Sequence, residues 1–295
     1  MRAIATSTLV AVALAATACT GSMEAYFAAD VVDTWRDLPY VDGTTNPRQM
    51  LDLYLPREAG QVPVVVFVHG GYWIAQDKDY FQPVVGLYRN VGIALARRGI
   101  GAAVINYRLV PDVTFDQQLD DVARAVAWVQ THIADYGGAP DQLVLAGHSA
   151  GGHMTALAAF DDARLTAAGV DVTTIRGYAP LSPIFDLQHM ADHPPRAGFN
   201  VEVTGPVFGS ALAANSPRTY FRAGVAPLLV VMGDRDEPFL LEQIPSAVAE
   251  LQALGASVTL AVLADHGHED LVLDFDTDHD AVTPLVAGFV RDVTR

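Results

Sequence analysis

The stretch with the clearest chemical signature is Gly147-His148-Ser149-Ala150-Gly151. It follows an apolar run and precedes a segment typical of a helix, which predicts a sharp strand-to-helix turn. Such a turn lifts the serine hydroxyl away from the sheet on a strained backbone, and the flanking glycines let it close without collisions. We therefore predict Ser149 as a nucleophile rather than as part of an ordinary turn.

A serine nucleophile needs a base and an acid that orients the base, and both follow in the order typical of a sheet enzyme. Asp236 follows the apolar run LLVVM and is the predicted acid, with Asp234 and Glu237 as alternatives. His268 directly precedes a helix-like stretch and is the predicted base, with His266 as the alternative. The two histidines could instead bind a metal, but no third ligand stands at a suitable spacing, so we predict neither metal nor cofactor.

A glycine pair at the end of the apolar run VPVVVFVHGG supplies the complementary half of the site. Acyl transfer builds negative charge on a carbonyl oxygen, and fixed backbone N–H groups stabilise that charge. We predict the amides of Gly70, Gly71 and Ala150 as these donors, because glycine lets the backbone come close to a substrate. Tyr72 and Trp73 follow, and we expect them to shape the substrate pocket or to pack under the loop.

Three further histidines stand beside these motifs. We predict His148 as a residue of the substrate pocket. His69 precedes the glycine pair and is predicted to brace that loop rather than to act as a base. His153 lies on the helix after the serine, where a packing role is more typical than a catalytic one.

The elements that must position these residues alternate along the chain. Apolar runs predict strands over 50–56, 62–70, 100–108, 142–149, 175–182, 227–234 and 257–263, the first of them as a half-buried edge strand. Helical spacing of apolar residues predicts helices over about 80–98, 114–138, 150–160, 241–255 and from about 279 onward. Buried strands alternating with helices predict an α/β fold, a mostly parallel sheet covered on both faces.

The chain is expected to hold one catalytic domain over residues 46–295. The stretch from about 182 to 225 breaks the strand–helix rhythm and is rich in proline, so we predict a lid-like insertion there. Residues 19–45 are mixed in character and are predicted as a leader onto the domain.

The first residues predict export. A positive start is followed by an apolar, alanine-rich stretch ending in ATAC, which is typical of a bacterial signal peptide. We predict residues 1–18 as a signal peptide of the lipoprotein type, with Cys19 as the lipidated first residue of the mature protein and its membrane tether. Ordinary secretion is the alternative.

Composition excludes other classes. The formal net charge is −16, from 34 acidic and 18 basic residues, and no Lys/Arg cluster is present, so we expect no nucleic-acid partner. The single cysteine cannot form an intrachain disulfide, and the fold must depend on its core.

Taken together, the motifs HGGYW, NYRL, GHSAGGH, GDRD and the late histidine resemble the α/β-hydrolase superfamily. The nearest resemblance is to its carboxylesterase and arylformamidase branch, related to hormone-sensitive-lipase-like esterases, over residues 46–295. It implies the α/β-hydrolase fold, a triad of Ser149, Asp236 and His268, and no cofactor. The H-G-G-x-W form is typical of arylformamidases, which open N-formylkynurenine.

We therefore expect an exported serine hydrolase that cleaves small to medium carboxylic esters through an acyl-enzyme. The alternative is an arylformamidase or related amidase using the same site. A non-catalytic binding module is the distant alternative, and it would predict a broken triad.

Overall fold

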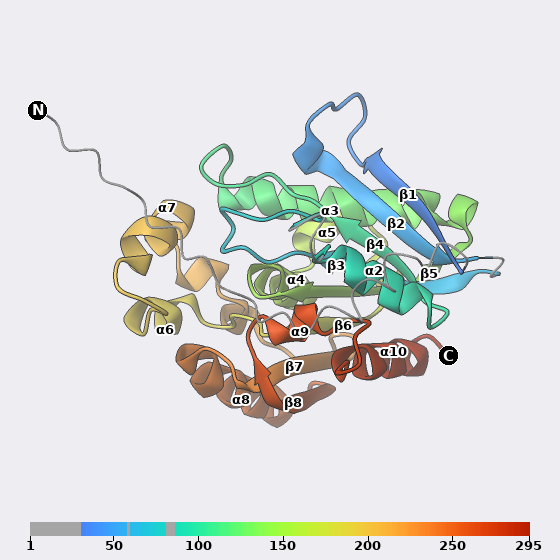
Figure 1. Cartoon of the computed structure of the whole chain (residues 1–295). Coiled ribbons are helices and arrows are strands. Elements are labelled where there is room, and N and C mark those ends of the chain that lie inside the picture. Colours follow the sequence, from blue (N-terminus) through green and yellow to red (C-terminus); the bar gives the residue numbers. More distant parts are fainter. Residues whose placement is uncertain (1–30, 58–59, 81–85) are drawn as a thin grey trace, which may run out of the picture.

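The computed structural model describes residues 31–57, 60–80 and 86–295 (Figure 1). The predicted signal peptide, Cys19 and the first part of the predicted leader lie outside these residues. The centre of the structure is a sheet of eight strands. The strands are β1 (Val32–Pro39), β2 (Met50–Pro56), β3 (Val62–Val68), β4 (Gly101–Ile105), β5 (Gly138–His148), β6 (Ile175–Leu181), β7 (Leu228–Arg235) and β8 (Val258–Gly267).

The sheet has the strand order β1-β2-β4-β3-β5-β6-β7-β8. Strands β3 to β8 run parallel to one another, and β1 and β2 join this sheet in antiparallel pairs. The predicted α/β fold with a mostly parallel sheet is confirmed. Because parallel strands end at the same edge, the residues that follow β3, β5, β6, β7 and β8 gather there.

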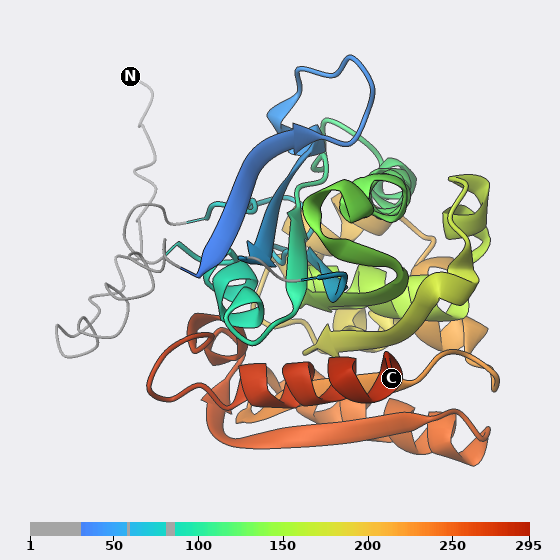
Figure 2. The same cartoon turned by 90° about the vertical axis from the view of Figure 1, so that its right-hand side faces the viewer.

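Helices cover both faces of the sheet. The helices of the described residues are α2 (Arg89–Ala96), α3 (Phe115–His132), α4 (Ala150–Phe160), α5 (Ala163–Ala167), α6 (Leu187–Asp192), α7 (Gly205–Phe208), α8 (Pro238–Ala253), α9 (Asp270–Leu273) and α10 (Val282–Val293). Buried residues of α3, α4 and α8 form one apolar cluster with the sheet, and those of α2, α9 and α10 form the other. Figure 2 shows α2 on one side of the strands and α3 and α4 on the other.

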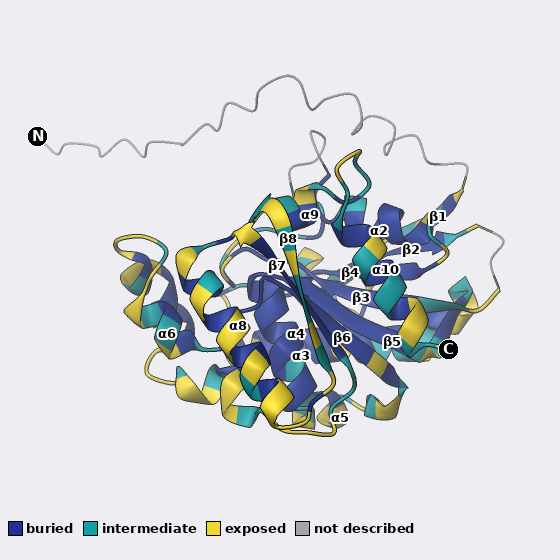
Figure 3. Cartoon of the chain, turned by 90° about the horizontal axis from the view of Figure 1, so that it is seen from below, coloured by how far each residue is buried: buried dark blue, intermediate teal, exposed yellow. Residues whose placement is uncertain are grey.

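Strand β3 shows why its sequence is apolar throughout. Val64, Val66 and Val68 belong to the cluster under α3, α4 and α8, whereas Val65 and Phe67 belong to the opposite cluster. A strand that is buried on both faces has no polar side, so the period-two alternation disappears. Figure 3 shows the central strands as the most deeply buried part of the molecule.

The prediction that residues 50–56 form an edge strand is wrong. Strand β2 pairs with β1 on one side and with β4 on the other, so β1 is the edge strand. The alternation in β2 comes from Asp52, which is fully buried because the buried Lys78 ammonium lies 2.8 Å from its carboxylate. A paired charge can be buried where an unpaired one cannot.

The segment between β6 and β7 spans the range of the predicted insertion, and it contains α6, a π-helical stretch (Asn200–Thr204) that leads directly into α7, and two short 3-10 helices (Ala213–Asn215 and Pro217–Tyr220). Figure 1 shows α6 and α7 to one side of the sheet, away from the C-terminus. Within the described part of the chain, no helix is both long and apolar enough to span a membrane.

Candidate active site

Ser149 lies in the turn between β5 and α4, with φ +56° and ψ −116°. Its N–H donates to the carbonyl of Leu181 at the end of β6 (2.9 Å), which fixes the turn against the sheet. The glycines of the motif are required by space: a Cβ on Gly151 would lie 2.1 Å from the carbonyl oxygen of Val68, and one on Gly147 would lie 2.5 Å from the carbonyl oxygen of Gly151. A non-glycine residue held at positive φ marks stored strain of the kind found in active sites.

Asp236 and His268 meet at the same edge. Asp236 follows β7 and His268 follows β8, and the His268 Nδ1–H donates to Asp236 Oδ1 (2.8 Å). The Glu237 backbone N–H donates to the same oxygen (2.8 Å). The hydroxyl of Ser182, directly after β6, donates to the second oxygen, Oδ2. Ser182 was not predicted; its only signal in the sequence is its position at the carboxyl end of a parallel strand beside β7.

These contacts shift the pKa values of Asp236 and His268 in opposite directions. Burial opposes the charge on Asp236, but the hydrogen bond and charge of His268, together with Ser182 and Glu237, hold the pKa of this carboxyl below its usual value. Burial also opposes a charged His268, but the hydrogen bond and charge of Asp236 raise the pKa of this imidazole above its usual value. An ionised acid therefore orients a base that is stabilised when it takes up a proton.

The alternative acid and base lie elsewhere. Asp234 is exposed, whereas Asp236 is 4% exposed. His266 directs its Nε2 to the carboxylate of Asp274 (3.3 Å), and its Nδ1–H donates to a backbone carbonyl two residues earlier (2.7 Å). The structure therefore pairs Asp236 with His268 and not with His266.

His148 connects the turn that holds Ser149 to His268, which follows β8. Its Nε2–H donates to the carbonyl of His268 (2.9 Å), and the two imidazole rings lie 4.6 Å apart. Burial lowers the pKa of His148 to about 3, so the ring is neutral near pH 7. His148 was predicted as a pocket residue, but it is only 1% exposed and its contact is with the predicted base. Through this contact His148, the neighbour of Ser149 in the chain, lies against His268.

The backbone N–H groups of the glycine loop differ in whether they already have a hydrogen-bond acceptor. The Gly70 N–H donates to the Tyr88 hydroxyl (2.9 Å), so this predicted donor already has an acceptor. The amides of Gly71 and Tyr72 have no acceptor among the described residues, and Gly71 adopts φ +105°. Ala150 is the first residue of α4, where a backbone N–H has no partner within the helix.

The two aromatic residues of the loop have different surroundings. Tyr72 is 39% exposed and meets Phe199 of the insertion edge-on, with ring centroids 5.2 Å apart. Trp73 is buried, and its ring packs edge-on against His153 (5.2 Å) and Phe208 (4.8 Å). Tyr72 therefore stands where it could border a pocket, and Trp73 packs under the loop.

His69 lies beneath the same loop. Its ring stacks on Tyr107, with centroids 4.3 Å apart, and its Nδ1–H donates to the Gly70 carbonyl (2.7 Å). Burial lowers the pKa of His69 to about 3. A neutral, stacked imidazole with this contact fits the predicted role of a brace.

Comparisons with known proteins agree with this architecture. An isoprenylcysteine alpha-carbonyl methylesterase from Arabidopsis thaliana is 29% identical over 263 residues, covering 81% of this chain and 57% of that protein. A kynurenine formamidase from Danio rerio is 24% identical over 274 residues, covering 89% of this chain and 84% of that protein. An inhibited esterase B from Lactobacillus rhamnosis superposes with a TM-score of 0.75 at 20% identity, covering 92% of this chain and 90% of that one.

This chain spans about half the length of the first curated relatives that it matches. The predicted resemblance to an α/β-hydrolase branch that includes carboxylesterases and formamidases is confirmed. The family model BD-FAE matches residues 51–251, more than half of the chain. The chain therefore belongs to the BD-FAE family.

Proposed function

We propose that this protein is a serine hydrolase that cleaves small to medium carboxylic esters through an acyl-enzyme. The observation that carries the proposal is the hydrogen bond between His268 and the buried carboxylate of Asp236, beside the strained turn that holds Ser149. An oriented base next to a hydroxyl on a sharp turn is the arrangement that nucleophilic acyl transfer requires.

In the proposed mechanism, the Ser149 hydroxyl attacks the ester carbonyl while His268 takes its proton. Asp236 holds the imidazole in the tautomer with hydrogen on Nδ1 and stabilises the imidazolium that forms. His268 then gives the proton to the leaving alcohol, and water releases the acyl group by the same steps in reverse. The amides of Gly71 and Ala150 stabilise the oxyanion, and the free amide of Tyr72 is a further donor where Gly70 is engaged by Tyr88.

Two substrate classes, an ester and a formamide, are candidates for this site. Support for an ester comes from relatives whose names are those of ester hydrolases, such as the methylesterase from Arabidopsis thaliana. Support for a formamide comes from the likeness to the kynurenine formamidase from Danio rerio and from Tyr72-Trp73 in the glycine loop. We favour the ester and keep the formamide as the second candidate.

The experiment compares kcat/KM on p-nitrophenyl esters of graded acyl length with kcat/KM on N-formylkynurenine. We expect turnover to be highest on short and medium acyl groups and lower on the formamide. The variant Ser149→Ala should lose turnover and labelling by a fluorophosphonate, whereas Ser210→Ala, at an exposed serine of the insertion, should keep both. Absence of turnover and of labelling in the unaltered protein would refute the proposal and favour a binding module.

We also propose that the protein is exported and tethered by a lipid on Cys19. The support is the pattern of residues 1–19, a positive start, an apolar stretch and the small residues before the cysteine. Membrane fractionation of the bacterial host tests it: Cys19→Ser should move the protein from the membrane to the soluble fraction. Retention of the variant in the membrane would contradict the tether.

A further inference from the structure

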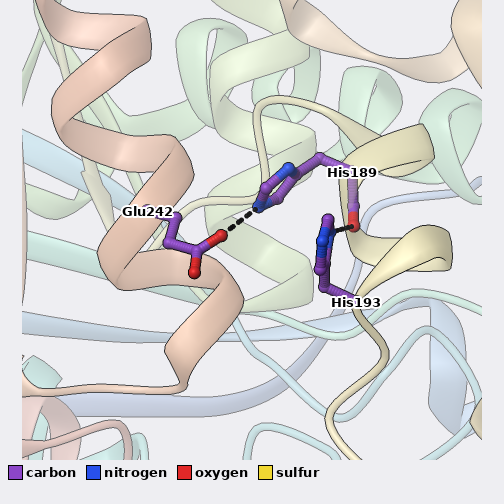
Figure 4. A group of neighbouring side chains, drawn as sticks. All are labelled: His189, His193 and Glu242. Carbon is purple, nitrogen blue, oxygen red and sulfur yellow. Dashed lines mark hydrogen bonds and ion pairs between the residues drawn. The ribbon is translucent and has the colours of Figure 1, made fainter.

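A cluster of metal-ligating side chains lies outside the proposed triad. His189 and His193 are four residues apart at the end of α6 in the insertion, and Glu242 lies on α8. One potential ligand atom of each residue lies within 4.8 Å of those of the other two. Figure 4 shows the His189 ring directed at the Glu242 carboxylate, with the His193 ring beside it.

The separation between His189 and Glu242 matches that of two ligands of one ion. His189 Nε2 lies 3.4 Å from Glu242 Oε2. Two ligands at about 2.1 Å from a tetrahedral zinc ion lie about 3.4 Å from each other. The His189 Nε2 atom is also buried, and its contact with Glu242 is an ion-pair distance without hydrogen-bond geometry, so within the described ranges this buried atom lacks the hydrogen bond that burial usually requires.

His193 is held in a form that suits coordination. Its Nδ1–H donates to the His189 carbonyl (3.1 Å), and a carbonyl can only accept, so the lone pair of the neutral ring lies on Nε2. A hydrogen bond from one ring nitrogen to a backbone carbonyl is the usual support of a histidine that binds metal through the other. The rings of His189 and His193 lie 4.5 Å apart, and His193 and Glu242 are exposed and free to adjust.

We propose that His189, His193 and Glu242 form a binding site for a divalent transition-metal ion of the zinc class, with water completing the coordination. Two imidazoles and one carboxylate favour zinc, cobalt or nickel over magnesium and calcium, which prefer oxygen ligands throughout. The site is independent of the proposed triad, and the inference stands whether or not the protein hydrolyses esters.

The ion would fasten the insertion to α8. These two parts already meet next to the cluster, because the buried Gln243 side chain accepts the N–H groups of Phe185 (2.9 Å) and Asp186 (2.8 Å). The metal therefore adds a second link to an existing junction. We expect the protein to fold without the ion and to gain stability when it binds.

The experiment uses the full chain without an affinity tag, stripped of metal with a chelator. Zinc is titrated by calorimetry, cobalt by its visible absorption, and the melting temperature is measured with and without zinc. We expect one ion per chain and a rise in melting temperature of roughly 5 °C at free zinc about a hundredfold above Kd. Ser149→Ala should bind zinc as the unaltered protein does, which separates this site from the proposed catalytic one.

The variants His189→Ala, His193→Ala and Glu242→Gln should each lower zinc affinity at least tenfold and lose the thermal shift. His132→Ala is the matched control, because the His132 Nδ1–H also donates to a carbonyl four residues earlier (2.8 Å) but the ring is outside the cluster. Zinc binding that is absent, or that is unchanged in all three variants, would overturn the proposal and leave a histidine–carboxylate contact without a metal.

Discussion

Replacement of Gly71 by alanine tests whether the glycine loop is an oxyanion site. The Cβ of Gly71→Ala would lie 2.2 Å from the Ala75 carbonyl oxygen, and ordinary contact begins at 3.4 Å, so one group must move by about 1.2 Å. The neighbours cannot yield freely, because the N–H groups of Ile74 (3.1 Å) and Ala75 (2.9 Å) both donate to the Gly71 carbonyl. The amide of residue 71 is therefore expected to shift.

A shift of this size is large for a donor that must lie within about 0.4 Å of its best distance from the oxyanion. Loss of one such donor costs about 2.7–4 kcal/mol of transition-state stabilisation, which lowers kcat roughly 10²- to 10³-fold. KM should change much less, because the charge develops only in the transition state. The φ of +105° adds a conformational penalty of about 1–2 kcal/mol to folding.

Gly169→Ala is the matched control for this backbone penalty. Gly169 also has a positive φ, +88°, but its Cβ would meet nothing within 4 Å. Both variants should lose the stability that the backbone penalty costs, Gly71→Ala should lose more in denaturant titrations because of its contact with Ala75, and only Gly71→Ala should lose turnover of a p-nitrophenyl ester. If folded Gly71→Ala keeps kcat within threefold of Gly169→Ala, the loop does not hold the oxyanion and the reasoning fails.

Three further predictions concern the acid and the base. Asp236→Asn should keep the fold but lower kcat on the ester by about 10⁴-fold, because the amide favours the wrong tautomer of His268; a loss below tenfold would contradict this. Ser182→Ala removes a buried hydrogen bond to a charged group, worth about 1.5–3 kcal/mol in a urea titration. Its kcat should fall less than tenfold, since the carboxylate is charged in both ground and transition states; an unchanged unfolding midpoint would refute the contact. In the pH profile, kcat/KM should fall as the pH drops through a pKa above 6.5, because only neutral His268 is a base. The same raised pKa stabilises the fold below pH 6.5, and this gain is lost as pH rises through the raised value.

The fold could be predicted wherever burial leaves a simple pattern. Strand β3 is apolar because it is covered on both faces, and the Thr114 side chain, which accepts the N–H of Gln117 (3.3 Å), marks the start of α3 at a threonine visible in the sequence. Strand β1 left no such pattern. It is an edge strand whose residues are almost all exposed or half-buried, so residues 32–39 resemble a polar leader in the sequence. The burial of Asp52 in β2 depends on Lys78, a partner that no local pattern reveals.

In the candidate site, too, some residues could be predicted from local sequence patterns and others could not. Ser149 and the glycine loop stand in contiguous motifs, because their function needs a particular backbone shape that short sequences encode. Ser182 is different, because it acts through Asp236, 54 positions later, and only the parallel pairing of β6 with β7 brings them together. The cluster of His189, His193 and Glu242 was missed for the same reason, since it depends on how α6 packs against α8.

Electrostatics gives an independent reason to propose His268, and not another buried histidine of this region, as the base. His69, His148 and His153 are all buried, and burial lowers their pKa values to about 3, about 3 and about 4. The hydrogen-bond partner of each ring is a backbone carbonyl, which orients a neutral ring but supplies too little charge to offset the loss of water. His268 differs in one partner, the Asp236 carboxylate, and it alone among these four has a raised pKa. An imidazole near the serine turn is suited to take up the proton of the nucleophile when a carboxylate stabilises the imidazolium that forms. The other three imidazoles lack such a carboxylate and stay neutral.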